Sequence, residues 1–559
     1  MTQLWRLRLV GGGLCLLLLL CGLRSFELQV QKQDFLRAEG ARRHVRVLVE
    51  PAQRGAIRDR HGEVLALSAP SESIWVVPSA LLADPDKIAP LARLLERDPR
   101  VLRAELEARS GRQFYYLARQ QPPAVARRIL ALEADGVFLQ REYRRFYPAA
   151  ETAAALVGIT DIDGRGQEGL ERSLETQLTG ASGQRRVIQD LQGRVVEDLS
   201  DYVAARNGQD VQLTIDLRLQ HAAYASLKAV GERENARSGQ ALFVDVRDGS
   251  ILAAASWPGV NPNDRSDGAA LRRGLRNRVA LDVFEPGSTI KPFVVAAALD
   301  AGVVDQNTVI ATGNGYLRIK GQDIRDVHGY GDVTLTRLLA KSSNIGAVRL
   351  GMRLGAQRLF NTYQALGFGF QTGSLVSDES SGVLPSPDSL GDTVAAYGYG
   401  FNVTLLQLAQ AWMALAAEGV PQPVRILADM PQPQIEPAFS PEVAAAVRQM
   451  LVAVVAPGGT ATQAAIPGWT VAGKTGTVRK VVDGNYAEDR HQALFVGMVS
   501  AHRPRVLGLV VVDEPHAGRF YGGELAAPVF SQVASQALRR LGVPPEPAAE
   551  LAQAAGGRS

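Results

Sequence analysis

Three short motifs carry residue types that could do chemistry together, and they follow one another along a chain of 559 residues. They are Ser288-Thr289-Ile290-Lys291, Ser342-Ser343-Asn344 and Lys474-Thr475-Gly476. The set combines a hydroxyl nucleophile, an amine able to accept its proton, a second hydroxyl and a second amine, which are the groups that acyl transfer through a serine requires. Each motif alone recurs by chance in many chains, but the ordered and widely spaced set indicates a serine acyltransferase.

The first motif is expected at the start of an apolar helix. Pro292 is tolerated only in the first turn, where its missing N–H would be unpaired in any case, so the helix should begin near Thr289. Ser288 would then lie at the helix N-terminus, where free N–H groups favour a developing oxyanion. Lys291 can act as a base only if burial or a neighbouring cation lowers its pKa. Taken alone, this motif also fits a serine N-cap beside a surface lysine.

The other two motifs supply candidates for proton relay and substrate binding. Ser342 could pass a proton between Lys291 and a leaving group, and the Asn344 amide could hold a substrate amide; a helix cap is the alternative there. Lys474 is expected to lower the pKa of Lys291 and to attract a substrate carboxylate. The pattern around Gly476 predicts a strand, where glycine is costly unless another backbone approaches closely, as a docked peptide would. A surface strand with an incidental lysine is the alternative.

The candidate residues form two groups. The candidate catalytic residues are Ser288, Lys291, Ser342 and Lys474, and the candidate substrate-binding residues are Asn344, Thr475, Gly476 and Thr477.

Length and composition predict a globular chain of two or more folded units. The formal net charge of +4 is small for this length, and no basic block is dense enough to indicate nucleic-acid binding. The densest basic cluster, residues 272–278, is expected to be solvated or salt-bridged. The 7 histidines are scattered without ligand spacing, so neither a metal site nor a cofactor is expected.

The N-terminus predicts a membrane anchor. An apolar run from Leu9 to Leu23 follows Arg6 and Arg8 and is closed by Arg24. The run is shorter than the ~20 residues that span a bilayer, but Trp5 and snorkelling arginines can extend it, and the positive flank places the N-terminus in the cytoplasm. A cleaved signal peptide is the alternative, although no clear small-x-small cleavage site follows. Both cysteines lie in this run, so no disulfide is expected in the exported part.

The remaining segments predict a mixed α+β fold. Early and late strands frame a helical middle, which suggests one mixed sheet covered by helices. The expected elements are a juxtamembrane helix over 25–49, a hairpin turning at 59–62, helices over 80–135, a strand over 211–215, a helix over 217–230, strands over 241–248, 250–257, 470–482, 493–500 and 506–513, and a closing helix over 528–541. From Val543 the Pro/Ala/Gly-rich sequence predicts a disordered tail.

The ordered motifs resemble those of penicillin-binding proteins, and further stretches resemble class B of that family, the D,D-transpeptidases. These stretches are Arg54-Gly55…Asp59-Arg60…Gly62, Tyr147-Pro148…Gly166…Glu168-Gly169…Glu171, Phe284-Glu285-Pro286-Gly287, Tyr521-Gly522-Gly523 and Ala526 to Phe530. The stretch from Lys474 to Lys480 is similar to the cell-division branch of the class, with Val478 where alanine is commoner.

The resemblance implies an α+β penicillin-binding transpeptidase domain, an elongated N-terminal pedestal domain and one N-terminal transmembrane helix. The implied segments are a cytoplasmic tail over 1–8, an anchor over 9–23, a pedestal domain of the dimerisation type over 24–210, a transpeptidase domain over 211–542 and a disordered tail over 543–559. The implied location is the inner membrane, crossed once, with the catalytic domain in the periplasm.

The implied activity is the cross-linking of peptidoglycan stem peptides through a serine acyl-enzyme during septal cell-wall synthesis. The implied partners are stem peptides ending in D-Ala-D-Ala, β-lactam antibiotics, the inner membrane, and divisome proteins that include a glycosyltransferase. The implied roles are Ser288 as nucleophile, Lys291 as its base, the N–H groups of Ser288 and Thr477 as oxyanion donors, Ser342 and Lys474 as proton relay, and Asn344 as the residue that orients the donor peptide.

Two alternatives remain open from the sequence. In a D,D-carboxypeptidase or serine β-lactamase, water replaces the acceptor amine. A free β-lactamase needs neither the anchor nor the long region before residue 210. No carboxylate that could activate water for deacylation is evident, although Glu285 lies beside the nucleophile in sequence. A catalytically silent penicillin-binding sensor or divisome scaffold would lose a motif serine or lysine, and none is lost here.

Overall fold

The computed structural model describes residues 2–35, 45–189, 195–374, 378–431, 433–482, 484–548 and 551. The chain divides into two units. The first unit comprises Met1–Arg54, Ala69–Arg144 and Thr179–Gly208, and the second comprises Gly55–Ser68, Arg145–Leu178 and Gln209–Ser559.

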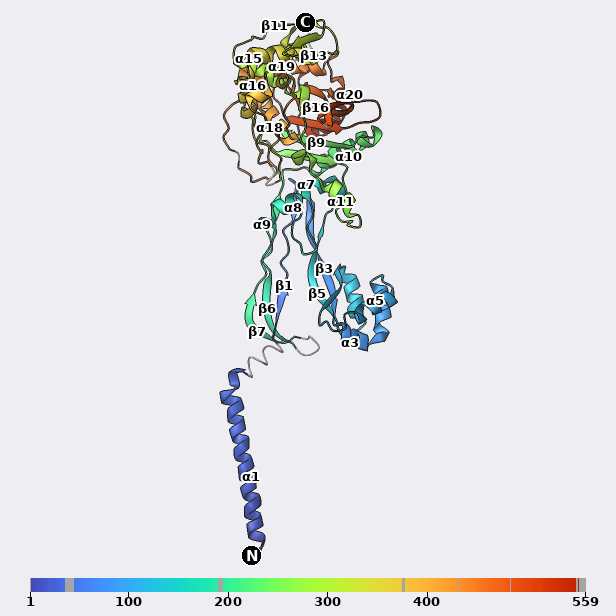
Figure 1. The fold of residues 1–559 in the computed structure, drawn as a ribbon, viewed down its shortest axis with the longest axis vertical. Helices are drawn as coiled ribbons and strands as arrows, with labels where there is room; N and C mark the ends of the chain where they lie inside the picture. Colours follow the sequence, from blue (N-terminus) through green and yellow to red (C-terminus); the bar gives the residue numbers. More distant parts are fainter. Residues whose placement is uncertain are drawn as a thin grey trace. The chain divides into compact units, whose positions relative to one another are not determined.

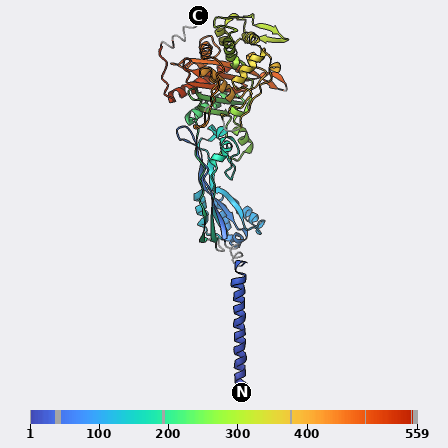
Figure 2. The ribbon, with the colours of Figure 1, turned by 90° about the vertical axis from the view of Figure 1, so that its left-hand side faces the viewer.

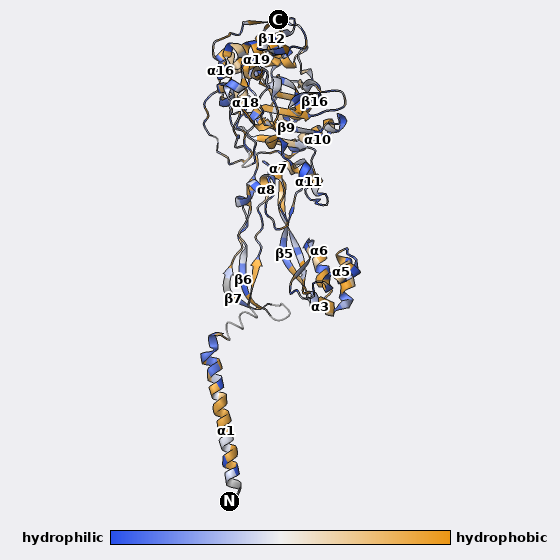
Figure 3. Ribbon diagram, viewed as in Figure 1, coloured by the Kyte–Doolittle hydropathy of each residue, from blue (hydrophilic) through white to orange (hydrophobic). Residues whose placement is uncertain are grey.

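The first unit begins with the apolar helix that the sequence predicts. Helix α1 spans Thr2–Phe26, a π-helical turn covers Glu27–Gln31, and together they are long and apolar enough to cross a membrane; Figure 3 shows the apolar residues along the middle of α1. The expected juxtamembrane helix is wrong at its end, because β1 occupies Val45–Glu50. Valines alternate along this stretch, which is a strand pattern. Residues 36–44 of that expected helix lie outside the described residues.

Two small sheets form the rest of the first unit. One has the order β1-β6-β7, and in the other β3 pairs with β4 and β5, of which this unit includes the parts within Ala69–Arg144. The strands are β3 (Val64–Val76), β4 (Tyr115–Gln121), β5 (Val137–Phe146), β6 (Gly183–Gln189) and β7 (Val195–Val203), and the helices are α3 (Pro78–Ala83), η2 (Pro85–Lys87), α4 (Ile88–Leu94), α5 (Pro99–Glu107) and α6 (Pro123–Leu130). The expectation of helices throughout 80–135 is wrong at β4, where aromatic residues with high strand propensity pair with β3.

A five-stranded antiparallel sheet organises the second unit, in the order β10-β9-β17-β16-β15. The strands are β9 (Ser238–Asp245), β10 (Ile251–Trp257), β15 (Val471–Val482), β16 (Asn485–Val499) and β17 (Val506–Asp513). All five were expected from their alternation or apolar runs, and β16 begins earlier than expected. Strand β15, which carries the third motif, lies at one edge of the sheet.

Helices cover both faces of this sheet (Figures 1 and 2). Helices α10 and α20 pack on one face and on each other, whereas α12, α18 and α19 pack on the other. Their bounds are α10 (Leu217–Arg233), α12 (Arg278–Leu281), α18 (Leu405–Ala416), α19 (Pro441–Val455) and α20 (Gly522–Arg540). The predicted α+β layering is therefore confirmed.

The remaining elements of the second unit are short or belong to its helical part. They are β2 (Ile57–Arg58), η3 (Ala150–Thr152), α7 (Ala154–Val157), α8 (Gly169–Ser173), α9 (Glu175–Leu178), β8 (Val211–Gln212), α11 (Gly268–Leu275), η4 (Gly287–Ile290), α13 (Lys291–Asp300), β11 (Val309–Gly313), β12 (Tyr316–Ile319), β13 (Gln322–Arg325), β14 (Gly331–Thr334), α14 (Leu335–Lys341), α15 (Asn344–Leu354), α16 (Ala356–Ala365), α17 (Pro387–Leu390), η5 (Ala395–Tyr397) and η6 (Thr462–Ala464). Helix α13 is buried almost throughout, as an apolar helix in a core should be.

The closing helix starts earlier than the sequence suggests. Pro528 was expected at its first turn, but α20 begins at Gly522 and contains the proline. A Cβ on Gly522 would lie 2.0 Å from the Leu494 carbonyl oxygen, and one on Gly523 would lie 2.0 Å from that of Thr460. The helix therefore starts in a space that only glycine fits, and packing on the sheet outweighs the proline.

The predicted disordered tail is only partly described. Residues 543–548 are present, and Glu546 accepts hydrogen bonds from the Thr470 N–H and hydroxyl at 2.8 and 2.9 Å. The start of the tail is thus bonded to the strand region, which is a correction to the prediction. Apart from residue 551, the rest of this tail lies outside the described residues.

A buried ion pair lies inside the second unit. Arg145 donates to Glu171 at 2.6 Å and to the Ser68 hydroxyl at 3.1 Å, and Glu171 is fully buried. The three residues join segments that are far apart in sequence.

Replacing Arg145 by alanine should destabilise this unit strongly. The Glu171 carboxylate would stay buried without its charged partner, and breaking a buried pair in this way costs about 3–5 kcal/mol. Differential scanning calorimetry should show a lower melting temperature for Arg145→Ala. An exposed arginine provides the control, because Arg103→Ala, which loses an ion pair on the surface of α5, should melt as the wild type does.

Candidate active site

The turn that carries Ser288 is fixed by its neighbours. Ser288 lies in η4, and α13 begins at Lys291 with Pro292 in its first turn, as the proline predicted. Gly287 has a φ of +53°, and a Cβ there would lie 2.4 Å from Cγ2 of Val478 on β15. Its N–H donates to the Gly398 carbonyl at 2.9 Å. Glycine is thus required where β15 presses on the turn.

Lys291 is fully buried and points at the second motif. Its Nζ donates to the Ser342 carbonyl and to Asn344 Oδ1, both at 2.6 Å, and to Ser342 Oγ at 3.3 Å. Burial lowers the pKa of Lys291 to about 7, although the nearby Asp326 charge opposes the shift. A substantial share of this amine is therefore unprotonated near neutral pH, which is the form a base needs.

Lys474 approaches the same hydroxyl from β15. It is fully buried, and its Nζ donates to Ser342 Oγ at 2.9 Å and to the Thr475 carbonyl at 3.0 Å. Burial and the charge of Lys291 hold the pKa of Lys474 well below its usual value. The expected effect of Lys474 on Lys291 needs correction, because burial is the main cause at Lys291 and the repulsion appears at Lys474. The three motifs meet at one serine hydroxyl.

Ser342 owes its position to a left-handed turn between α14 and α15. It adopts φ 57° and ψ 40°, and the next residue, Ser343, caps α15 by accepting from the Gly346 N–H at 2.9 Å. The two interpretations of this motif therefore hold for different serines: Ser343 is the helix cap, and Ser342 faces the lysines.

Asp326 secures this turn and was missed by sequence reasoning. Its carboxylate accepts from the Ser343 hydroxyl at 2.6 Å, the Asn344 N–H at 2.5 Å and the Ile345 N–H at 3.2 Å. Asp326 directly follows β13, and no local pattern in the sequence links it to the second motif. Only the tertiary structure brings the two segments together.

The third motif packs against the nucleophile turn. A Cβ on Gly476 would lie 3.1 Å from Cγ2 of Thr289 and 3.2 Å from Cβ of Leu494. The close neighbour that the glycine accommodates within the chain is thus the turn of Ser288, and the docking of a peptide on this strand stays a prediction. The Thr475 hydroxyl lies 2.9 Å from that of Thr460, and Thr477 Oγ1 accepts from the Gly522 N–H at 3.3 Å.

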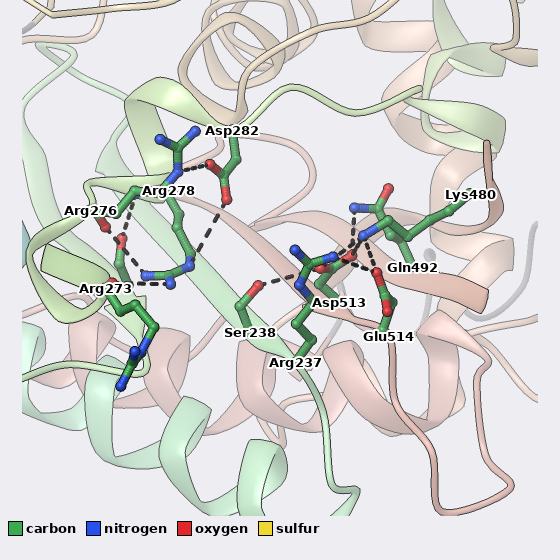
Figure 4. A network of polar contacts seen from close by, with 11 residues as sticks. Arg237, Ser238, Arg273, Arg276, Arg278, Asp282, Lys480, Gln492, Asp513 and Glu514 are labelled. Carbon is green, nitrogen blue, oxygen red and sulfur yellow. Dashed lines mark hydrogen bonds and ion pairs between the residues drawn. The ribbon is translucent and has the colours of Figure 1, made fainter. Parts of the chain in front are cut away.

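A charged network anchors β15 beyond the motif (Figure 4). Lys480 reaches Asp513 at 2.9 Å and Glu514 at 2.5 Å, across Gln492 of β16, which donates to Asp513 at 2.8 Å. Arg237 adds a contact to Glu514 at 2.9 Å. Arg490 also lies 4.0 Å from Glu514, and the ion pairs of Lys480 tie the edge strand to the centre of the sheet.

Figure 4 also shows the basic cluster that the sequence analysis set apart. Arg276 contacts Asp282 at 2.5 Å, and Arg278 lies 3.9 Å from the same carboxylate. The cluster is salt-bridged, as expected, although it belongs to α11, α12 and the turn between them rather than to one loop.

Comparison with known proteins identifies the family. Residues 239–535 match the penicillin binding protein transpeptidase domain, and residues 49–213 match the penicillin-binding protein dimerisation domain. The peptidoglycan D,D-transpeptidase FtsI of Escherichia coli K12 is 39% identical over 555 residues, which cover 97% of this chain and 93% of that protein. This chain belongs to the penicillin-binding protein transpeptidases.

Other members of the family are similar along most of their length. The probable peptidoglycan D,D-transpeptidase PenA of Neisseria gonorrhoeae is 38% identical, covering 98% of this chain and 94% of that protein. The apo transpeptidase domain of Burkholderia pseudomallei penicillin-binding protein 3 gives a TM-score of 0.55 at 38% identity, covering 60% of this chain and 98% of that one. Penicillin-binding protein 3 of Mycobacterium tuberculosis, complexed with aztreonam, gives 0.69 at 26% identity, covering 89% and 98%.

In this transpeptidase, the structure brings most of the candidate residues into one hydrogen-bonded group. Lys291, Ser342, Asn344, Lys474 and Thr475 are joined by direct contacts. Ser288 precedes Lys291 by one turn. Helix α1 is long and apolar enough to serve as a single-pass membrane anchor.

Two variants of Asp326 should separate its charge from its contacts. Asp326→Asn keeps an acceptor for the N–H groups of the turn but removes the charge that raises the pKa of Lys291, so the pH midpoint of acylation by a penicillin should fall. Asp326→Ala removes the contacts as well and should slow acylation roughly tenfold at every pH. Stopped-flow acylation across pH measures both; equal profiles for the two variants would contradict this assignment.

Proposed function

We propose that the chain cross-links peptidoglycan stem peptides during septal wall synthesis, through an acyl-enzyme on Ser288. The observation that carries the proposal is the Ser342 hydroxyl, to which the Lys291 and Lys474 amines both donate; Lys291 itself lies three residues after Ser288. Relatives named peptidoglycan D,D-transpeptidase support the same reaction.

Acylation begins when Ser288 Oγ attacks the carbonyl between the last two D-alanines of a donor peptide. Neutral Lys291 takes the hydroxyl proton, and the carbonyl oxygen becomes an oxyanion bound by the N–H groups of Ser288 and Thr477. Collapse of this intermediate breaks the peptide bond. The leaving D-Ala amine receives a proton through Ser342 and Lys474, and an amine of a neighbouring stem peptide then takes the acyl group.

Binding of the donor would also set the protonation states of the two lysines. The terminal carboxylate of the donor, placed near Lys474, would raise the pKa of that amine by its opposite charge. The proton shared within the pair would then reside on Lys474, leaving Lys291 neutral as the base. In the free site the pKa values of both amines are lowered, so either could be the base. Binding of the substrate thereby makes Lys291 the base and Lys474 the proton donor.

The donor peptide would lie along the open edge of β15. An extended peptide can add to an edge strand through backbone hydrogen bonds.

The Asn344 amide donates one N–H to the Arg325 carbonyl at 2.9 Å, and its Oδ1 accepts from Lys291. Because an amide nitrogen carries two hydrogens, Asn344 keeps one donor for the peptide.

The hydrolase alternative needs a carboxylate that activates water at the acyl carbonyl. Asp326 is engaged by three donors of the second motif, and Glu285 accepts from Gly400 and Tyr486. Asp326 is therefore committed to the turn before α15, and Oε1 of Glu285 is committed to Gly400 and Tyr486, which favours transfer to an amine.

The same proposal includes location and organisation. The arginines before α1 favour a cytoplasmic N-terminus and a catalytic unit in the periplasm, and residues 24–210 and 211–542 are the proposed pedestal and transpeptidase domains. The matched ranges 49–213 and 239–535 support these boundaries. We include divisome proteins, with a glycosyltransferase among them, as its partners because chemistry on septal peptidoglycan requires new glycan.

A fluorescent penicillin should label the protein covalently. Ser288→Ala should abolish labelling, and Lys291→Ala should slow it by roughly 10²–10⁴-fold because the base is lost. Gel fluorescence and intact-mass spectrometry measure the adduct. Lys228→Ala, which removes a half-exposed lysine paired with Glu151, should label as the wild type does. No adduct on the wild type would refute the proposal, and an adduct that clears within seconds would favour the hydrolase.

Acylation should become faster as pH rises through about 7. The pKa of Lys291 is lowered to about 7, so the neutral base predominates above that pH and is protonated below it. The rate constant should fall about tenfold per pH unit on the acid side and level off on the alkaline side. Stopped-flow measurements at constant ionic strength test this; a rate that does not change between about pH 5 and 9 would contradict the role of Lys291.

A further inference from the structure

Glu285 lies three residues before Ser288 and carries a carboxyl group that the proposed mechanism does not use. Its Oε1 accepts hydrogen bonds from the Gly400 N–H at 2.8 Å and from the Tyr486 hydroxyl at 3.1 Å. Its Oε2 is shielded from solvent and has no hydrogen-bond partner within the described parts of the chain. A buried carboxylate oxygen without a hydrogen bond destabilises the folded state. Glu285 is therefore not explained by a contribution to stability, which points to a role in function.

The contact with Gly400 belongs to a continuous seam before the nucleophile. Phe284 and Val403 exchange two backbone hydrogen bonds, of 3.0 and 2.9 Å, and the Gly287 N–H donates to the Gly398 carbonyl at 2.9 Å. A Cβ on Gly398 would lie 2.0 Å from the Gly287 carbonyl oxygen. The segment that leads into Ser288 is therefore fixed to the loop over 398–403.

The contact with Tyr486 reaches a different element, the hairpin of β15 and β16. Tyr486 lies near the start of β16, opposite Val481 of β15. Its ring packs edge-on against that of Tyr399, with centroids 5.4 Å apart, yet the residue is 47% exposed. Burial and the Glu285 charge raise the pKa of Tyr486, so its hydroxyl keeps the proton that it donates.

The hairpin thus meets the nucleophile segment at its middle, where Gly476 also lies against Thr289, and toward its far end. Near its middle, Val478 presses on Gly287. Toward its far end, Tyr486 binds Glu285. Contacts at the middle alone would let the hairpin pivot, whereas the added contact toward the far end fixes its angle against the turn of Ser288.

We propose that Glu285 is a positioning residue for acylation: through Tyr486 it fixes the angle of the β15–β16 hairpin, and so holds the N–H groups of Ser288 and Thr477 at the spacing that an oxyanion requires. The inference rests on the proposed function. Because the contact is present in the free protein and involves none of the groups that the proposed mechanism assigns to the substrate, it acts on the formation of the tetrahedral intermediate rather than on the binding of a penicillin.

Stopped-flow acylation by a penicillin tests this, because it separates the dissociation constant of the non-covalent complex from the acylation rate constant. Tyr486→Phe should lower the rate constant about tenfold and leave the dissociation constant within about twofold. Glu285→Gln keeps an acceptor oxygen and should retain most of the rate. Glu285→Ala should be slow, and adding Tyr486→Phe to it should change nothing more, since the two residues act through one contact.

A matched control removes the same kind of bond elsewhere. Tyr202 donates to Glu50 at 3.0 Å in the first unit, so Tyr202→Phe should acylate as the wild type does. The inference is overturned if Tyr486→Phe acylates at the wild-type rate, if the two losses multiply independently, or if the slow rates follow a lower melting temperature. It is also overturned if Glu285→Gln slows only deacylation, which would make Glu285 a base for water. A wild-type protein that does not acylate refutes the proposed function instead.

Discussion

Two fully buried amines donating to one hydroxyl form the interaction on which the rest of the site depends. Lys291 and Lys474 both reach Ser342 Oγ, at 3.3 and 2.9 Å. Two ammonium groups this close repel each other, and the repulsion is strong because the surroundings are poor in water. Loss of one proton relieves it. Burial and this repulsion together leave the pair short of a proton near neutral pH, and in the proposed mechanism the donor carboxylate then makes Lys291 the neutral base.

The fold holds this arrangement through backbone contacts rather than through side chains alone. The Lys291 amine is held by the Ser342 carbonyl and the Lys474 amine by the Thr475 carbonyl. Neither carbonyl can shift unless the turn before α15 or the strand β15 moves with it. The apolar helix α13 buries the first amine, and the sheet buries the second. Separate segments of the sequence thus converge because each one completes the polar contacts of another.

The sequence was informative where chemistry is local. Pro292 fixed the start of α13, and the three motifs named the residues that meet at Ser342. It was silent where the cause is tertiary: nothing near Asp326 indicates that its carboxylate holds the turn of another segment. Expectations from the sequence were wrong or incomplete where one residue pattern fits two different structures. Gly476 accommodates the turn of Ser288, a neighbour that its pattern did not indicate, and a strand interrupts the region that was expected to be helical.

The edge strand must meet two opposing demands. To receive a peptide, β15 must leave its outer backbone groups unpaired, but an open edge also invites pairing with other chains and lets the strand move. One half of β15 can receive a peptide, and the other half holds the strand in place and discourages pairing with other chains. The motif half rests on the turn of Ser288, and the far half carries the exposed Arg479 and the anchored Lys480. Charges disfavour pairing with a foreign strand, and the ion pairs to Asp513 and Glu514 hold the edge to the sheet. The unpaired backbone edge that a substrate peptide could bind is thereby confined to the half of β15 that carries the third motif.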